Sequence, residues 1–264
     1  MATARDIDEF VRDLDPDIRS EKSCDGLKYG DLDAEVRAIG TTWMASVDVL
    51  RRAVEKDINL IVTHEPTFWY SGTPASPELE RCEREGVYVG TKVRYLDEHG
   101  ITIIRAHDCW DLYPEYGVEP SLCKVLGFPA PARYLGGLHS VYNIPTTTLG
   151  DLARHCKTAM GLPHVRVSGD LRKTVRRIAI AYGSSSSTKW YWDFSRAGAD
   201  AVLSGEQSEW STVRPAIDMG LGVIELGHAA TEAYGMDGMA RLLEESFPGI
   251  LIQHLRTDPS FQWV

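Results

Sequence analysis

The sequence predicts an α/β fold made of two similar halves, because two patterns recur along its 264 residues. Short, almost wholly apolar segments such as INLIVTH (58–64) and ITIIRAH (101–107) are typical of parallel strands that are covered on both faces. Segments with apolar residues at helical spacing stand between them. This alternation indicates helices layered on parallel sheets. The length is enough for one large domain or two of moderate size.

The first half is expected to open with a helix, since Ile7, Phe10 and Val11 are spaced as on one helical face of IDEFVRDL (7–14). A Gly- and Asp-rich loop, CDGLKYGD (24–31), follows it. The later elements expected here are a strand at 36–43, a helix at 46–56, a strand at 58–64, an inserted polar loop at 71–85, a helix at 91–100 and a strand at 101–107.

The second half shows the same alternation. Its expected elements are a short helix at 119–128, a strand at 139–144, a helix at 146–162, strands at 164–170 and 175–183, a helix at 189–197, a strand at 199–205, a helix near 211–219, a strand at 222–226 and a last helix at 234–247. We expect one half in residues 1–130 and the other in residues 131–264, packed as one compact unit.

The spacing of polar residues after the strands suggests an internal repeat. Thr63–Glu65 aligns with Ser204–Glu206, and His107–Asp111 aligns with His228–Glu232. A duplicated unit would place matching strand ends around a pseudo-twofold axis, where a shared site can form between the halves. Successive βαβ units also resemble each other for physical reasons, so the spacing alone leaves duplication and shared physics both open.

Three of the predicted strands end in residue types that bind metals. These are the pairs His64 and Glu65, His107 and Asp111, and His228 and Glu232. Functional groups in α/β sheets collect beyond the carboxyl ends of strands, and a separation of four residues on a helical turn directs both side chains to one centre. Pro66 ends the first of these strands, so the adjacent His64 and Glu65 can serve two neighbouring ions.

The number and type of these ligands predict the metals. Three imidazoles and three carboxylates are too many for a tetrahedral zinc site but suit two divalent ions that share a bridging ligand. Mixed nitrogen and oxygen ligands without a thiolate favour manganese, iron, zinc or cobalt.

Composition excludes several classes of partner. The net charge of −10 and the pI near 5.3 argue against nucleic acid. The apolar runs are too short to span a bilayer, and the N-terminal segment lacks the apolar core of a signal peptide. Five cysteines without a CxxC pair fit reduced thiols. We therefore expect a cytoplasmic protein without membrane or nucleic-acid partners.

Three motifs carry a resemblance to a known family. THEP (63–66), AHDCWD (106–111) and GHAATEAYGM (227–236) follow successive strands, and CDGLKYGD and AYGSSSS (181–187) add to the likeness. Together they resemble the Nif-three-like family of dinuclear metal-centre proteins (the YbgI type), some of whose members carry the name type 2 GTP cyclohydrolase I. The likeness runs over nearly the whole chain, and GHAATE is its most specific element.

The resemblance implies a ligand set and an assembly. It assigns metal-ligand roles to His64, His107, Asp111, His228 and Glu232, and it implies a toroidal homohexamer. Family members usually have a second histidine at the position of Glu65. Another position that is often histidine is Trp210 here.

Glu65 changes the charge of the expected centre. Glu65, Asp111 and Glu232 supply three negative charges, so two divalent ions and one hydroxide would give a neutral cluster. We expect Glu65 to be a ligand, the site to prefer harder ions such as manganese or ferrous iron, and its water to be less acidic. The alternative is a Glu65 that turns to solvent beside a single metal.

Other residues have a functional and a structural interpretation. Gly183–Ser187 could cradle a phosphate, with Lys189 adding charge, or simply cap a helix. Trp69, Trp110 and Tyr234 could line a substrate pocket or fill the core. Glu206 is a candidate base at the position equivalent to Glu65.

The function predicted from these observations is that of a metal-dependent hydrolase. A water shared by two metals would attack a nucleotide-like, C–N or phosphoester substrate, with Glu65 or Glu206 as catalytic proton carrier. The sequence does not identify this small-molecule substrate. The alternative is a non-enzymatic metal-binding or regulatory protein that acts as a ring-shaped oligomer.

Overall fold

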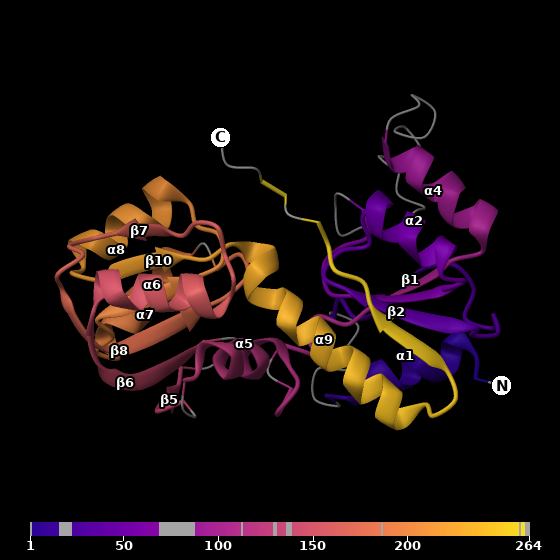
Figure 1. Ribbon diagram of the computed structural model, residues 1–264, viewed down its shortest axis with the longest axis horizontal. Helices are drawn as coiled ribbons and strands as arrows, with labels where there is room; N and C mark the ends of the chain where they lie inside the picture. Colours follow the sequence, from indigo (N-terminus) through magenta and orange to yellow (C-terminus); the bar gives the residue numbers. More distant parts are fainter. Residues whose placement is uncertain are drawn as a thin grey trace. The chain divides into compact units, whose positions relative to one another are not determined.

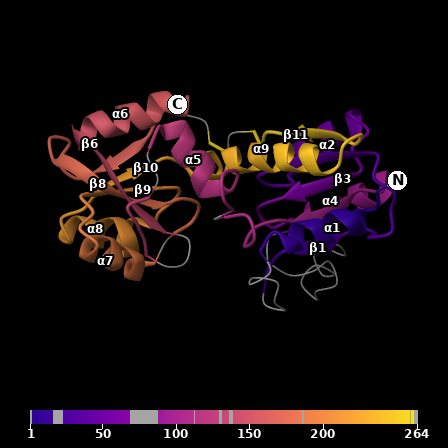
Figure 2. The same ribbon diagram turned by 90° about the horizontal axis from the view of Figure 1, so that it is seen from below.

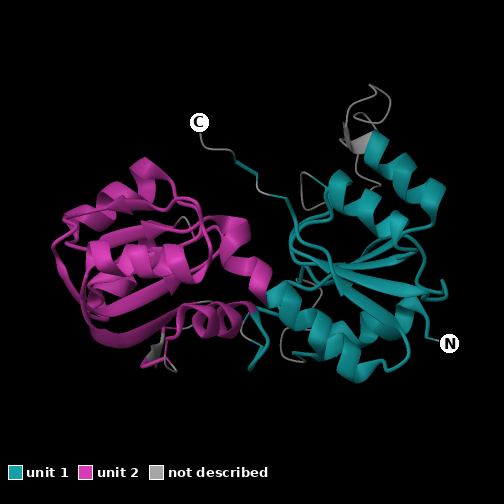
Figure 3. Cartoon of the chain, in the orientation of Figure 1, with its two compact units in different colours: residues 1–117, 235–264 teal, residues 118–234 magenta. Residues whose placement is uncertain are grey.

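The computed structural model describes residues 2–15, 23–68, 88–111, 113–128, 131–135, 139–185, 187–258 and 260–261. The chain forms two compact units, residues 1–117 with 235–264 and residues 118–234 (Figure 3). The division differs from the expected halves, 1–130 and 131–264, in two respects: the first boundary falls after residue 117, and residues 235–264 return to the first unit. This return is caused by the pairing of a late strand, Leu251–His254, with Ala38–Thr42.

The first unit is built on a sheet of five described strands in the order β1-β4-β3-β2-β11. Their bounds are β1 (Gly26–Tyr29), β2 (Ala38–Thr42), β3 (Leu60–Thr63), β4 (Thr102–Arg105) and β11 (Leu251–His254). β11, β2, β3 and β4 run parallel, while β1 is antiparallel to β4. Every residue of β2, β3 and β4 is buried, as the apolar runs predict.

Helices cover both faces of this sheet (Figure 1). α2 (Val47–Glu55) and α4 (Tyr88–His99) lie on one face, where Leu50 and Leu96 pack with Ile61 and Ile103 in one core cluster. α1 (Ala4–Asp13) and the second part of α9 (His228–Ser246) lie on the other. The apolar stripe expected on 7–14 is confirmed, since Ile7 and Val11 are buried.

The second unit contains a sheet of six described strands in the order β5-β6-β8-β9-β10-β7. The bounds are β5 (Arg133–Tyr134), β6 (Ser140–Thr148), β7 (Arg166–Ser168), β8 (Thr174–Ala181), β9 (Ala201–Ser204) and β10 (Gly222–Glu225). β8, β9 and β10 are parallel. The helices are α5 (Val118–Leu126), α6 (Leu149–Ala159), α7 (Thr188–Arg196), a π-helical turn η1 (Glu209–Val213) and α8 (Arg214–Asp218). α6 lies on one face of the sheet, and α7 and α8 lie on the other (Figure 2).

The two units repeat one topology, which confirms the prediction of similar halves. Elements α1-β1-β2-α2-β3-α4-β4 correspond in order to α6-β7-β8-α7-β9-α8-β10. In each of these two series the first strand, β1 or β7, pairs antiparallel with the last, β4 or β10, which is one of three parallel strands. Even the first helices match, because Thr3 caps α1 at Asp6 and Thr148 caps α6 at Asp151. The correspondence thus includes a helix (α1 and α6) and a strand (β1 and β7) that lie outside the segments aligned by sequence.

Some expected elements differ from the structure. Residues 26–29 form a strand inside the expected loop, and β5 and β11 were not predicted. α9 begins at His228 rather than at residue 234, because the GHAATE motif itself starts the helix. The expected polar loop at 71–85 lies outside the described residues. Among the described helices, none combines the length and the apolar character that crossing a bilayer requires.

A buried carboxyl group in the second unit, that of Glu119, should make the stability of the fold depend on pH. Tyr142 donates a hydrogen bond to Glu119, whose pKa is raised by burial above its ordinary value of 4.5. The folded chain therefore keeps a proton that the unfolded chain loses, so stability falls as pH rises from 4.5 to the raised pKa. Each pH unit within that window costs about 1.4 kcal/mol.

We expect Glu119→Gln to remove this slope, because the amide keeps a hydrogen bond to Tyr142 without ionising. Urea unfolding at several pH values above 4.5 measures it, with the exposed Glu98→Gln as control. An unchanged slope in Glu119→Gln would contradict the assignment.

Candidate metal centre

In the first unit, two neighbouring strand ends bring three predicted ligands together. His64 follows β3 directly, and His107 follows the adjacent β4 by two residues. Asp111 is in the turn after His107. One ligand atom from each of these residues lies within 4.8 Å of the others. The parallel pairing of β3 with β4 thus produces the cluster that the sequence pairs predict.

The orientation of His64 suits a metal ligand. Its Nδ1 lies 3.0 Å from the carbonyl oxygen of Ala106, which can only accept, so this nitrogen carries the proton. Nε2 is therefore the atom with a lone pair, and it lies 3.6 Å from Oδ1 of the buried Asp111. A backbone carbonyl that fixes the imidazole tautomer is a common support for metal-binding histidines.

Asp25 holds the turn that carries the other two ligands. Its carboxylate accepts hydrogen bonds from the backbone N–H groups of His107, Asp108 and Cys109, at 2.6, 3.1 and 2.9 Å. In the sequence, Asp25 stands out only as part of the Gly- and Asp-rich loop at 24–31. Its one local signal is an Asp-Gly pair just before a strand, which does not identify a partner at residue 107.

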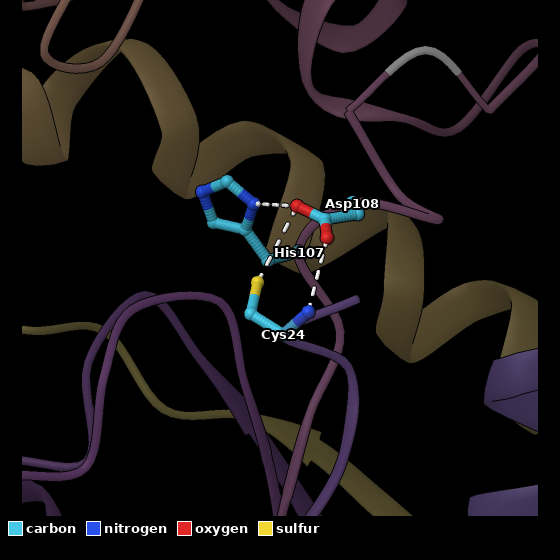
Figure 4. Close-up of side chains that lie close together, drawn as sticks. All are labelled: Cys24, His107 and Asp108. Carbon is cyan, nitrogen blue, oxygen red and sulfur yellow. Dashed lines mark hydrogen bonds and ion pairs between the residues drawn. The ribbon is translucent and has the colours of Figure 1, made fainter. Parts of the chain in front are cut away.

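His107 has a second set of neighbours (Figure 4). Its Nδ1 is 2.9 Å from Oδ1 of Asp108, which also lies 3.3 Å from the Cys24 sulfur. The hydrogen bond with His107 holds the pKa of Asp108 well below its usual range. Burial lowers the pKa of His107, but its hydrogen bonds to Asp108 and Cys24 outweigh burial and raise it to about 11. Cys24 and Asp108 were not among the predicted site residues.

His107 also contacts the rest of the cluster. Its ring stacks on that of His64 with centroids 4.4 Å apart, and its Nδ1 is 3.6 Å from Oδ2 of Asp111. A metal ion that binds the His107 imidazole must displace a proton from it. Protons and metal ions therefore compete for this cluster.

Glu65 does not turn to open solvent. Its side chain is 13% exposed, and its Oε2 lies 4.0 Å from the Arg105 guanidinium. Arg105 also donates from Nε to the His64 carbonyl oxygen at 2.7 Å. The same arginine thus fixes the backbone of one predicted ligand and lies beside the carboxylate of the next.

The second unit assembles its own predicted residues. His228 is in the first turn of α9, and its Nε2 lies 3.1 Å from Oε2 of Glu232, one turn later. Its Nδ1 lies 3.7 Å from Oε1 of Glu206, which follows β9 by two residues. The four-residue spacing therefore places both side chains on one face, as expected, with Glu206 beside them.

Two glycines allow the turn after β8 to lie close to these side chains. Gly183 has φ +61°, and a Cβ there would lie 2.0 Å from Oε1 of Glu232 and 3.4 Å from Nε2 of His228. A Cβ on Gly205 would lie 2.1 Å from the Gly183 carbonyl oxygen. The Gly183 N–H donates to the Thr231 hydroxyl at 3.1 Å. The glycine turn after β8 is therefore packed directly against the His228–Glu232 pair.

The remaining candidates are distributed differently. Trp110 is fully buried, donates to the Gly235 carbonyl and stacks on Tyr113, so it fills the core. Tyr234 donates to the Met160 carbonyl. Lys189 pairs with Asp193 and lies over the Trp190 ring.

Three further positions complete the set. Ser187 is the N-cap of α7, but its side chain makes no capping bond. Trp210 is 82% exposed on η1. Trp69 lies outside the described residues.

Comparison with known proteins adds the family. The profile of Duf34/NIF3 (NGG1p interacting factor 3) matches residues 2–259. A "GTP cyclohydrolase 1 type 2 homolog" from Pseudomonas aeruginosa is 32% identical over 232 residues, which are 85% of this chain and 84% of that protein. A protein of the same name from Clostridium perfringens is 24% identical, covering 86% of each chain.

Solved structures share the fold. The protein ybgI, of unknown function, has a TM-score of 0.81 at 22% identity and covers 98% of this chain and 100% of its own. Reduced HcgD from Methanocaldococcus jannaschii has a TM-score of 0.74 at 23% identity, covering 96% and 97%.

Proposed function

The chain belongs to the Duf34/NIF3 family, and from this premise we propose that its candidate ligands bind two divalent metal ions in a hydrolase. The observation that carries the proposal is the cluster of His64, His107 and Asp111, whose ligand atoms lie within 4.8 Å of one another. His228 and Glu232, after the equivalent strand of the second unit, are the other proposed ligands.

The residues fit such ions chemically. Asp111 is 1% exposed, and a buried carboxylate requires compensating positive charge. Imidazole and carboxylate ligands without a thiolate suit manganese, iron, zinc or cobalt. The missing Cβ of Gly183 leaves room for the carboxylate of Glu232 beside His228. Two bound ions would supply Lewis acidity and an acidified water.

The chain supplies the proton carriers and the orientation. Glu206 has 56% of its side chain exposed and lies 3.7 Å from Nδ1 of His228, so it can exchange protons with solvent at the edge of the cluster. Glu65 is the second candidate, held near Arg105. The backbone carbonyl of Ala106 and the carboxylate of Asp25 fix the positions of the two histidines in the first unit. The substrate class we propose is a nucleotide-like, C–N or phosphoester compound.

Metal content and turnover test this function together. The metal-loaded protein is screened against phosphodiesters, nucleotides and amides, with His228→Ala as the inactive control. We expect two ions per chain, fewer in His228→Ala, and turnover that disappears in the variant. Stoichiometric metal without turnover of any class would overturn the hydrolase. It would favour the alternative, a metal-binding ring such as a hexamer, for which the exposed Trp192 and Trp210 offer apolar contact surface.

Glu65 has its own test because Arg105 offers it a competing partner. If Glu65 is a ligand, Glu65→Ala lowers metal content, and Glu65→His restores it with preference shifted toward zinc. Metal analysis after loading with equimolar manganese and zinc measures both effects. Two ions per chain with unchanged preference in Glu65→Ala would mean that Glu65 serves Arg105 and not the metal.

A further inference from the structure

Cys24, His107 and Asp108 form a second group of metal-binding residue types in the first unit. Cys24 precedes Asp25, whose carboxylate holds the backbone of the turn that contains His107 and Asp108. One ligand atom from each of the three residues lies within 4.8 Å of the others, and all three residues are partly exposed. Cys24 and Asp108 are not among the ligands proposed for the hydrolase. The group therefore differs from that centre in chemistry, because it contains a thiol.

One oxygen of Asp108 lies where two donors meet. Nδ1 of His107 is 2.9 Å from Oδ1 of Asp108, and the Cys24 sulfur is 3.3 Å from the same oxygen (Figure 4). An ionised carboxylate can only accept, so a hydrogen of the imidazole and the hydrogen of the thiol both point at this oxygen. The nitrogen, the sulfur and the oxygen thus face a common point.

The other oxygen of Asp108 is held by the chain. Oδ2 accepts hydrogen bonds from the Cys24 N–H at 3.0 Å and from the Ser23 hydroxyl at 3.2 Å. These bonds fix the rotation of the carboxylate and leave Oδ1 directed at the imidazole and the thiol. Supports of this kind orient the ligands of metal sites. The carboxylate is therefore already placed as a ligand that shares an ion with His107 and Cys24.

The separations suit a small divalent ion. Around a tetrahedral zinc with bonds of roughly 2.0–2.3 Å, nitrogen, oxygen and sulfur ligands lie about 3.3–3.6 Å from one another. The nitrogen–oxygen separation of 2.9 Å and the sulfur–oxygen separation of 3.3 Å are both within about half an ångström of these values. Three protein ligands leave the fourth position of such an ion to water.

The thiol decides which ions the group selects. Thiolate sulfur favours zinc and similar ions, whereas carboxylate and water suit manganese and magnesium. Binding exchanges two protons, one from the Cys24 thiol and one from Nδ1 of His107, for one divalent ion. Both protons pass to solvent, so the net charge of the group does not change.

We propose that Cys24, His107 and Asp108 bind a thiophilic divalent ion such as zinc. Nδ1 of His107 also lies 3.6 Å from Oδ2 of Asp111. One nitrogen binds one ion at a time, so zinc on Cys24 withdraws this nitrogen from the ion proposed beside Asp111. The site does not depend on the hydrolase, because the thiolate gives it a signature of its own.

Cobalt is the probe, because a thiolate bound to cobalt adds a sulfur-to-metal charge-transfer band in the near ultraviolet that imidazole and carboxylate ligands do not give. The full chain, stripped with EDTA and kept reduced, is titrated with cobalt. We expect a saturable band that disappears in Cys24→Ser and remains in Cys156→Ala, the control at a buried cysteine of the second unit. Asp108→Asn should weaken the cobalt affinity read from the band at least about tenfold. No band in the natural chain, or a band that survives Cys24→Ser, overturns the proposal.

His64→Ala separates this site from the hydrolase centre. It removes a ligand proposed for the hydrolase only, so the band should remain. Bound metal and turnover without a band would overturn the thiolate site and leave the hydrolase standing. A band without turnover of any substrate class would do the reverse.

The natural chain gives a second readout that needs no variant. Cys24 is partly exposed, so iodoacetamide can alkylate it, and mass spectrometry of its peptide measures the rate. A thiolate that binds an ion is no longer free to react. We expect saturating zinc to slow the alkylation of Cys24 at least about tenfold, and magnesium to leave the rate unchanged. An equal rate with and without zinc would overturn the proposal.

Discussion

Asp25→Ala is expected to lose about 3 kcal/mol of unfolding free energy and most of its metal affinity. Three backbone N–H groups, those of His107, Asp108 and Cys109, lose their acceptor at once. Each such buried donor costs on the order of 1–3 kcal/mol, and partial access of water to the turn lowers the sum. The same turn carries two proposed ligands, so metal affinity should fall about 10–100-fold, as it does when outer supports of metal sites are removed.

Asp25→Asn is the matched control for this change. Its amide keeps one oxygen of similar size and position, so it can accept part of the hydrogen bonding without the charge. We expect it to retain more than half of the stability that Asp25→Ala loses. Urea unfolding and metal titration of the same samples measure both effects. Equal unfolding midpoints for Asp25→Ala and the natural protein would contradict the role assigned to this carboxylate.

The sequence could predict the candidate ligands better than their supports. Each of the pairs at residues 64, 107 and 228 follows an apolar strand, and the parallel pairing of β3 with β4 brings the first two of these strand ends together. The supports depend on contacts across long separations. Asp25 binds N–H groups more than 80 positions later, and Arg105 reaches the carbonyl of His64 across the sheet. No local pattern encodes these partners.

The fold shows the same distinction. The alternation of strands and helices, and the correspondence of the halves, follow from periodicity that the sequence displays directly. Periodicity does not predict β1 and β11, because both are short edge strands that form only by pairing with β4 and β2. The sequence predicts the start of α9 too late, because the helical turn expected at His228–Glu232 is continuous with the helix expected only from residue 234. The division of the units differs for a related reason, because β11 joins a sheet whose other strands lie far earlier in the chain.

Gly183→Ala is expected to destabilise the second unit and to lower its metal content. The new Cβ would lie 2.0 Å from Oε1 of Glu232, which is far closer than two non-bonded atoms can approach. The backbone of residue 183 also has φ +61°. The left-handed conformation costs a non-glycine residue about 1–2 kcal/mol. The contact must also displace Glu232 or the turn, which separates Glu232 from His228. We therefore expect a loss of about 2 kcal/mol or more in stability and a reduced metal content.

Gly161→Ala separates the two causes. Gly161 has φ +63°, nearly the same as Gly183, but a Cβ there meets no heavy atom within 4 Å. It should therefore carry the conformational cost alone and leave metal binding intact. The difference between the two variants then measures the crowding of Glu232. Unchanged metal content in Gly183→Ala would mean that Glu232 can move without loss of metal. The proposed ligand role of Glu232 would then have to be abandoned. A ligand that lies 3.1 Å from Nε2 of His228 cannot be displaced and still bind the same ion.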